Sequence, residues 1–175
     1  MDTIKVGPFG GVSGSIWDVK LGDGLAGIYV SYDKDIVYSL MLLNYVNENL
    51  VKSEKCGSQK CKNCCVVIFD YPSGFLTSIT GLFARVDKTS TICLSSIKFG
   101  TNKGSYGPFG TPSTDYENNF EFNFVIGNHQ YFGGFHGTKS LDGIGSIGFY
   151  VKNIPSSVLK LKDNLVKVKK EKEED

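Results

Sequence analysis

The sequence predicts an all-β protein, and three observations support this. The 175 residues include 21 glycines, 12 phenylalanines and nine tyrosines, a composition typical of many short strands joined by tight turns. Runs of alternating or β-branched residues recur along the chain at the spacing of successive strands. Helical periodicity is absent before the final segment, which begins at residue 154.

Eight segments carry the strand pattern and are bounded by residues that favour turns. They are Ser15–Leu21, Gly27–Tyr32, Val37–Val46, Cys65–Phe69, Phe75–Ile79, Thr91–Phe99, Phe120–Ile126 and Gly145–Val151. Turns are predicted at 22–24, 71–74, 101–104 and 110–113. Glycine supplies positive φ at these positions and proline fixes φ, so the chain can reverse direction there.

A short repeat indicates how the strands are grouped. The tetrapeptide Gly7-Pro8-Phe9-Gly10 recurs unchanged at Gly107–Gly110, and Gly57 lies midway between the two copies. Repeated strand-and-glycine units favour a threefold internal repeat. Three similar sheets around one core would leave few exposed sheet edges, as in prisms and propellers.

The length fits a single domain, which we expect to span residues 1–153. The remaining residues, 154–175, are predicted to form a charged, flexible tail, because seven of the last eight side chains are charged. Within this tail, Val158–Val168 alternates and is compatible with an added edge strand or a short helix.

The near-neutral charge and the lack of recognisable targeting segments argue against nucleic-acid and membrane partners. The net charge is +1, so no global field attracts nucleic acid or an anionic membrane. The start, Met1–Lys5, lacks the features of a signal peptide, and no apolar run is long enough to span a bilayer. Five cysteines and the absence of Asn-x-Ser/Thr sites favour reduced thiols. We expect no nucleic-acid or membrane partner and a location in the cytosol or nucleus.

No catalytic or cofactor constellation is evident. The two histidines, His129 and His136, are not part of a recognisable nucleophile–base arrangement, and Asp33 and Asp35 fit solvated turn positions. Neither a phosphate-binding loop nor a dinucleotide fingerprint is present. The sequence therefore predicts a protein that is not an enzyme and needs no cofactor.

The four clustered cysteines, Cys56, Cys61, Cys64 and Cys65, have a C-x4-C-x2-C-C spacing. Four thiolates can hold zinc, but neighbouring Cys64 and Cys65 point to opposite faces of a strand. Free thiols are the favoured interpretation, with no metal site.

Several segments together resemble the mannose-class jacalin-related lectins of plants. The stretch Val6–Asp18, with its Gly-Pro-Phe-Gly-Gly run, is similar to the opening strand and glycine loop of that family. Further matching segments follow in order at 69–81, 95–102, 106–110, 132–137, 141–145 and 149–151. The resemblance covers about Ile4 to Val151 and implies a β-prism I of three four-stranded Greek-key sheets with pseudo-threefold symmetry. It also implies non-catalytic sugar binding.

The resemblance implies one sugar site, formed by Gly14, Thr138, Lys139, Ser140 and Asp142. In the family, a first-loop glycine N–H and a Gly-x-x-x-Asp loop hold the sugar, and an ionised carboxylate can accept two vicinal hydroxyls. Here the loop is about two residues short. If the gap falls early, Thr138 takes the glycine position, and Lys139, Ser140 and Asp142 still present N–H groups and a carboxylate. If it falls late, this cradle is lost.

Other features of the family narrow the expected ligand. The extra sites of some relatives are missing, since Cys56–Gln59 lacks the paired glycine and Tyr38 replaces an aspartate. The galactose-preferring branch needs a chain cleaved to expose an N-terminal glycine, whereas this chain begins Met1-Asp2. The resemblance therefore implies mannose- or glucose-type glycans as partners, and homo-oligomers. The alternative is a degenerate prism without sugar binding that acts through protein contacts.

Overall fold

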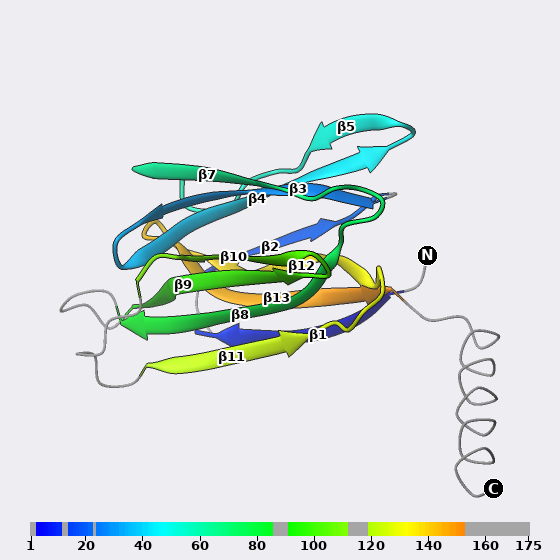
Figure 1. Cartoon of the computed structure of the whole chain (residues 1–175). Helices are drawn as coiled ribbons and strands as arrows, with labels where there is room; N and C mark the ends of the chain where they lie inside the picture. Colours follow the sequence, from blue (N-terminus) through cyan, green and yellow to red (C-terminus); the bar gives the residue numbers. More distant parts are fainter. Residues whose placement is uncertain (1–2, 12–13, 23, 86–90, 112–118, 153–175) are drawn as a thin grey trace, which may run out of the picture.

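The computed structural model describes residues 3–11, 14–22, 24–85, 91–111 and 119–152, and it is all-β as predicted (Figure 1). The described part contains thirteen strands. They are β1 (Thr3–Gly10), β2 (Ser15–Lys20), β3 (Gly24–Asp33), β4 (Ile36–Val46), β5 (Asn49–Lys52), β6 (Cys56–Gly57), β7 (Asn63–Ile68), β8 (Leu76–Arg85), β9 (Ile92–Thr101), β10 (Gly104–Phe109), β11 (Phe120–Val125), β12 (Phe132–Lys139) and β13 (Ile144–Lys152).

The strands form three antiparallel sheets, ordered β1-β13-β12-β2, β10-β9-β8-β11 and β5-β4-β3-β7. The short strand β6 pairs with the same edge of β4 as β5 does, at Ser39 and Leu40, whereas β5 pairs at Leu43–Val46. Together β5 and β6 fill one strand position, so each sheet has four positions. This confirms the predicted β-prism of three four-stranded sheets.

The centre of the prism is built from one inner strand of each sheet. Strands β4, β9 and β13 contact one another, and Leu40, Ile97 and Ile147 are fully buried on them. A buried serine precedes each of these three side chains at positions 39, 96 and 146. The predicted threefold repeat is therefore present in the packing of the core.

Three glycines repeat the same contact against these inner strands. Gly10, Gly57 and Gly110 have φ values of 116°, 131° and 76°, which favour glycine. A Cβ atom at Gly57 or Gly110 would lie 2.2 or 2.1 Å from the carbonyl oxygen of Tyr38 or Ser95, and one at Gly10 would lie 2.8 Å from the carbonyl oxygen of Gly145. Only glycine lets the outer strand approach this closely.

The two Gly-Pro-Phe-Gly copies adopt the same local structure. The pairing of β1 with β13 shifts between Val6 and Phe9, and that of β10 with β9 shifts between Tyr106 and Phe109. Both Gly-Pro peptide bonds are cis. The sequence repeat is thus a repeat of conformation.

All eight predicted strand segments overlap observed strands, but several ends were wrong. The segment Phe75–Ile79 belongs to a strand that continues to Arg85, and Cys65–Phe69 belongs to one that ends at Ile68. The pattern missed β5 and β6, because β5 is exposed on both faces and β6 has two residues. It also missed β1, β10 and glycine-rich β12, although segments of all three were matched by the family resemblance.

The predicted tail, residues 154–175, lies outside the described residues, and so does Val158–Val168. Across the described strands and loops, we find no helix of the length and apolarity needed to cross a membrane. Trp17 on β2 is 7% exposed and belongs to the hydrophobic core.

Candidate functional site

Three loops at one end of the prism line a groove of about 850 Å³. They are the β1–β2 loop with Gly14, the β6–β7 loop with Gly57–Lys60, and the β12–β13 hairpin with Lys139–Asp142. Four of the five predicted site residues therefore share this groove: Gly14, Lys139, Ser140 and Asp142.

The fifth predicted residue, Thr138, lies in β12 beside the groove and is not part of its lining. Its hydroxyl oxygen is 2.7 Å from the hydroxyl oxygen of Ser146 on β13. Thr138 thus bonds across the sheet, and the hairpin turns after it.

Gly14 lies directly against the hairpin. Its φ is 116°, and a Cβ atom there would be 2.5 Å from the carbonyl oxygen of Lys139. The next residue, Ser15, pairs with Lys139 in the sheet. A side chain at position 14 would push the first loop away from the groove wall, so glycine is required by the close approach.

The shortened hairpin closes by internal hydrogen bonds. The Ser140 N–H donates to the Gly143 carbonyl at 3.0 Å, and the Asp142 N–H donates to the Ser140 hydroxyl at 3.2 Å. Leu141 at the tip is 89% exposed. Two N–H groups that the family resemblance assigns to sugar binding are therefore engaged within the turn. The Asp142 carboxylate still faces solvent, with 43% of the side chain exposed.

The β6–β7 loop supplies residues that the sequence did not reveal. The buried Ser58 hydroxyl donates to the Leu141 carbonyl at 3.0 Å and accepts from the Lys60 N–H at 3.1 Å. The Lys60 ammonium lies 3.6 Å from an Asp142 carboxylate oxygen. The threefold repeat was the available signal, since equating Gly57 with Gly10 brings both glycine loops to the same end of the prism.

Two buried thiols lie near the loops of the site. Burial raises the pKa of Cys56 to about 12, although nearby Lys139 opposes the shift. Burial also raises the pKa of Cys93, whose thiol is hydrogen-bonded with the Ser140 side chain. Both groups are protonated at neutral pH and are poor nucleophiles and metal ligands.

The other three cysteines of the C-x4-C-x2-C-C segment lie in the β6–β7 loop and on β7. Cys61 and Cys64 are exposed, whereas Cys65 is half-buried on β7. In the ranges that the structure describes, no three His, Cys, Asp or Glu side chains are arranged to hold a metal ion.

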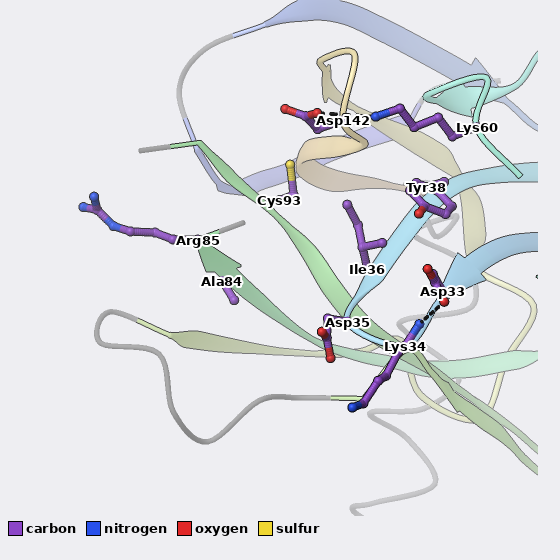
Figure 2. Close-up of a pocket in the computed structure, with 10 residues that line it drawn as sticks. All are labelled: Asp33, Lys34, Asp35, Ile36, Tyr38, Lys60, Ala84, Arg85, Cys93 and Asp142. Atoms are coloured by element: carbon purple, nitrogen blue, oxygen red, sulfur yellow. Dashed lines mark hydrogen bonds and ion pairs between the residues drawn. The ribbon is translucent and has the colours of Figure 1, made fainter. Parts of the chain in front are cut away.

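A smaller cavity of about 310 Å³ adjoins the groove and shares Lys60 and Asp142 with it (Figure 2). The β3–β4 turn lines its other side. In that turn, the Asp33 carboxylate accepts from the Lys34 N–H at 2.7 Å and lies 3.3 Å from the Lys62 ammonium. The backbone hydrogen bond, helped by Lys62, lowers the pKa of Asp33.

His136 lies away from the groove, on the sheet that contains β12. Its Nε2 atom is 2.9 Å from the carbonyl oxygen of Val6, and its ring packs against Tyr150. Burial lowers the pKa of His136. Tyr150 in turn donates a hydrogen bond to Asp18. These contacts give His136 a structural role.

Known proteins resemble this chain in both sequence and fold. The family model described as "Jacalin-like lectin domain" matches residues 6–150. Protein RESTRICTED TEV MOVEMENT 1 from Arabidopsis thaliana is 32% identical over 162 residues, which is 89% of this chain and 90% of that protein.

Solved lectin structures show the same architecture. Frutapin from Artocarpus incisa is 29% identical and superposes with a TM-score of 0.75, covering 87% of this chain and 99% of its own. The artocarpin–mannotriose complex is also 29% identical over the same shares of the two chains, with a TM-score of 0.74. The match to the family model spans nearly all the described strands. The chain is a member of the jacalin-like lectin domain family.

Proposed function

We propose that this protein is a non-catalytic lectin that binds mannose- or glucose-type glycans in the groove at Asp142. The observation that carries the proposal is the solvent-facing Asp142 carboxylate, which lies in an open groove that Gly14 also lines. Membership of a lectin family and the mannotriose bound by artocarpin support it.

The groove offers the chemistry that a pyranose ring requires. The Asp142 carboxylate accepts hydrogen bonds from vicinal sugar hydroxyls, and the neighbouring Lys60 ammonium donates to sugar oxygens. Leu141 presents an exposed apolar side chain at the rim, which can cover the apolar edge of a sugar ring. Gly14 keeps the wall between the first loop and the hairpin free of a side chain.

A single open groove leaves much of a sugar in contact with water, so we infer weak binding per site. Useful avidity then comes from several linked copies, and we propose that the lectin works as a homo-oligomer. We further propose that residues 1–153 are the lectin domain, with 154–175 as its charged tail, and that the protein resides in the cytosol or nucleus.

Calorimetric titration with methyl α-mannoside and methyl α-glucoside tests the proposal. We expect wild-type binding and a loss of about tenfold to a hundredfold in Asp142→Asn, because charge-assisted hydrogen bonds contribute about 1.5–3 kcal/mol. Asp35→Asn is the matched control, since Asp35 lines the neighbouring cavity only. Undiminished binding in Asp142→Asn contradicts this site.

A second candidate is a prism that has lost sugar binding and acts through protein contacts. The engaged N–H groups of Ser140 and Asp142 favour it, and so does Lys60, which already pairs with the carboxylate. The similarity to a protein named for restricted TEV movement is compatible with this role. If wild-type protein binds no sugar on a glycan array, the second candidate replaces the first.

A further inference from the structure

The lining of the groove is more positive than negative. Among its described lining residues, Lys60 and Lys139 carry positive charge and Asp142 carries the single negative charge. Lys60 comes from the β6–β7 loop and Lys139 from the end of β12, so the two lysines belong to different walls.

Lys60 is held by its backbone beside the carboxylate. Its N–H donates to the buried Ser58 hydroxyl at 3.1 Å, and its carbonyl accepts from the Ser31 hydroxyl at 3.1 Å. Ser58 itself donates to the Leu141 carbonyl of the hairpin. The loop that carries Lys60 is thereby tied to the hairpin that carries Asp142, which places the ammonium 3.6 Å from the carboxylate.

Lys139 contributes the second positive charge, from the β12–β13 side of the groove. Its backbone touches Gly14, and its charge acts on the buried thiol of Cys56 near the second glycine loop. Lys139 is half-buried and lines the groove. The Asp142 carboxylate can neutralise only one of the two lysines, so the groove keeps an excess positive charge.

The adjoining cavity has no such excess. Its described lining has three carboxylates, Asp33, Asp35 and Asp142, against the cations of Lys34, Lys60 and Arg85. Figure 2 shows the charged ends of Lys34 and Arg85 directed away from Asp142. The unbalanced positive charge therefore lies in the groove.

We propose that the groove selects sugars that carry an anionic substituent over their neutral counterparts. This inference rests on the proposed sugar-binding function and defines its ligand class. A phosphate or carboxylate group on the sugar contacts Lys60 and Lys139, while Asp142 accepts hydrogen bonds from the ring hydroxyls. An acidic substituent also offsets the partial loss of the Lys60–Asp142 pair when the sugar enters.

Two matched pairs of sugars test the selection by calorimetric titration of the full chain. The pairs are methyl α-mannoside with mannose 6-phosphate, and methyl α-glucoside with the methyl glycoside of glucuronic acid. We expect the acidic member to bind about threefold to tenfold more tightly near 20 mM salt, the range for exposed ion pairs acting together. The advantage should shrink near about 200 mM salt, because screening weakens exposed charge pairs. Inorganic phosphate should bind more weakly than mannose 6-phosphate.

Single substitutions test which lysines cause the preference for acidic sugars. Lys60→Met and Lys139→Met should each reduce the acidic-to-neutral preference by about twofold to fivefold. Lys34→Met is the matched control and should keep the wild-type preference, since Lys34 lines only the neighbouring cavity. Ser58→Ala frees the loop of Lys60 and should also lower the preference, and thermal unfolding checks that each variant is folded.

The results separate this inference from the proposed function. Equal binding of acidic and neutral sugars, with binding still lost in Asp142→Asn, overturns the charge selection and leaves the lectin function intact. A preference that survives in both Lys60→Met and Lys139→Met also overturns it. Failure of every sugar to bind removes both proposals.

Discussion

The three repeats are alike in their inner strands but differ in the loops at the groove end of the prism. At the centre, Leu40, Ile97 and Ile147 occupy equivalent positions with equal burial. At the open end, the corresponding hairpins differ: Asp33 accepts a hydrogen bond within the β3–β4 turn and pairs with Lys62, whereas Asp142 of the β12–β13 hairpin pairs with Lys60 and lines the groove. Packing constrains the three repeats alike where they meet, and it leaves their solvent-facing loops free to differ. The candidate function therefore lies where the threefold symmetry is broken.

The largest expected effect on stability comes from truncating the buried side chains at the centre of the prism. Leu40→Ala, Ile97→Ala and Ile147→Ala should each lower the free energy of unfolding by about 2–5 kcal/mol, the cost of removing a fully buried aliphatic side chain. Urea denaturation measures the three values. Leu141→Ala at the exposed hairpin tip is the control and should leave stability nearly unchanged. A large cost in one repeat alone would argue against equivalent packing.

The repeated glycine contact should give the next largest effect. In Gly57→Ala and Gly110→Ala, the new Cβ meets a carbonyl oxygen of the inner strand at 2.2 and 2.1 Å. We expect each to lose more than about 2 kcal/mol, because positive φ alone costs about 1–3 kcal/mol for a non-glycine residue. Gly104→Ala separates the two causes, since φ is 145° there and no atom lies within 4 Å.

Denaturant midpoints provide this comparison. Gly104→Ala should cost about 1 kcal/mol, which is the backbone contribution without the clash. Equal losses at positions 57, 104 and 110 would show that backbone strain, and not the close approach of the strands, requires glycine.

The smallest effect is expected in the turn that contains Asp70. The Lys103 ammonium lies 2.6 Å from the Asp70 carboxylate, and hydrogen bonds from Lys103 and then Ser73 lower the pKa of Asp70. A lowered folded-state pKa stabilises the protein above the ordinary value of 3.8 and loses this effect as the pH falls through the folded-state value. Asp70 is exposed, so the change should be small.

Asp70→Asn tests this pH dependence. The stability difference from wild type should be present near neutral pH and should disappear on acidification, as measured by urea denaturation at a series of pH values. A difference that grows as the pH falls would contradict the assigned direction of the shift.

Much of the fold could be predicted because its determinants are local or repeated. Alternating side chains located eight strands, and the copies at Gly7–Gly10 and Gly107–Gly110 with Gly57 indicated three repeats. The strand β5 was not predicted, because its four side chains are all exposed and show no alternation of buried and exposed positions. The strand β6 is too short to show any period.

The candidate site was only partly predictable. Asp142 and Gly14 followed from the family resemblance, and both line the groove. Ser58 and Lys60 did not, because Ser58 reaches the hairpin from 83 residues away in sequence. The turn hydrogen bonds of Ser140 depend on backbone geometry that residue types alone do not specify. Long-range contacts and loop closure are therefore what the structure adds.

The burial of Trp17 gives the protein an intrinsic fluorescence signal that depends on its folded state. This is the single tryptophan of the chain, and its indole N–H is buried without a hydrogen-bond partner in the described structure. It lies on β2, three residues after Gly14, and packs near Gly137 of the strand that leads into the hairpin. Its fluorescence reports water entry at unfolding without any label. The same emission can also sense a ligand that shifts the first loop or the hairpin.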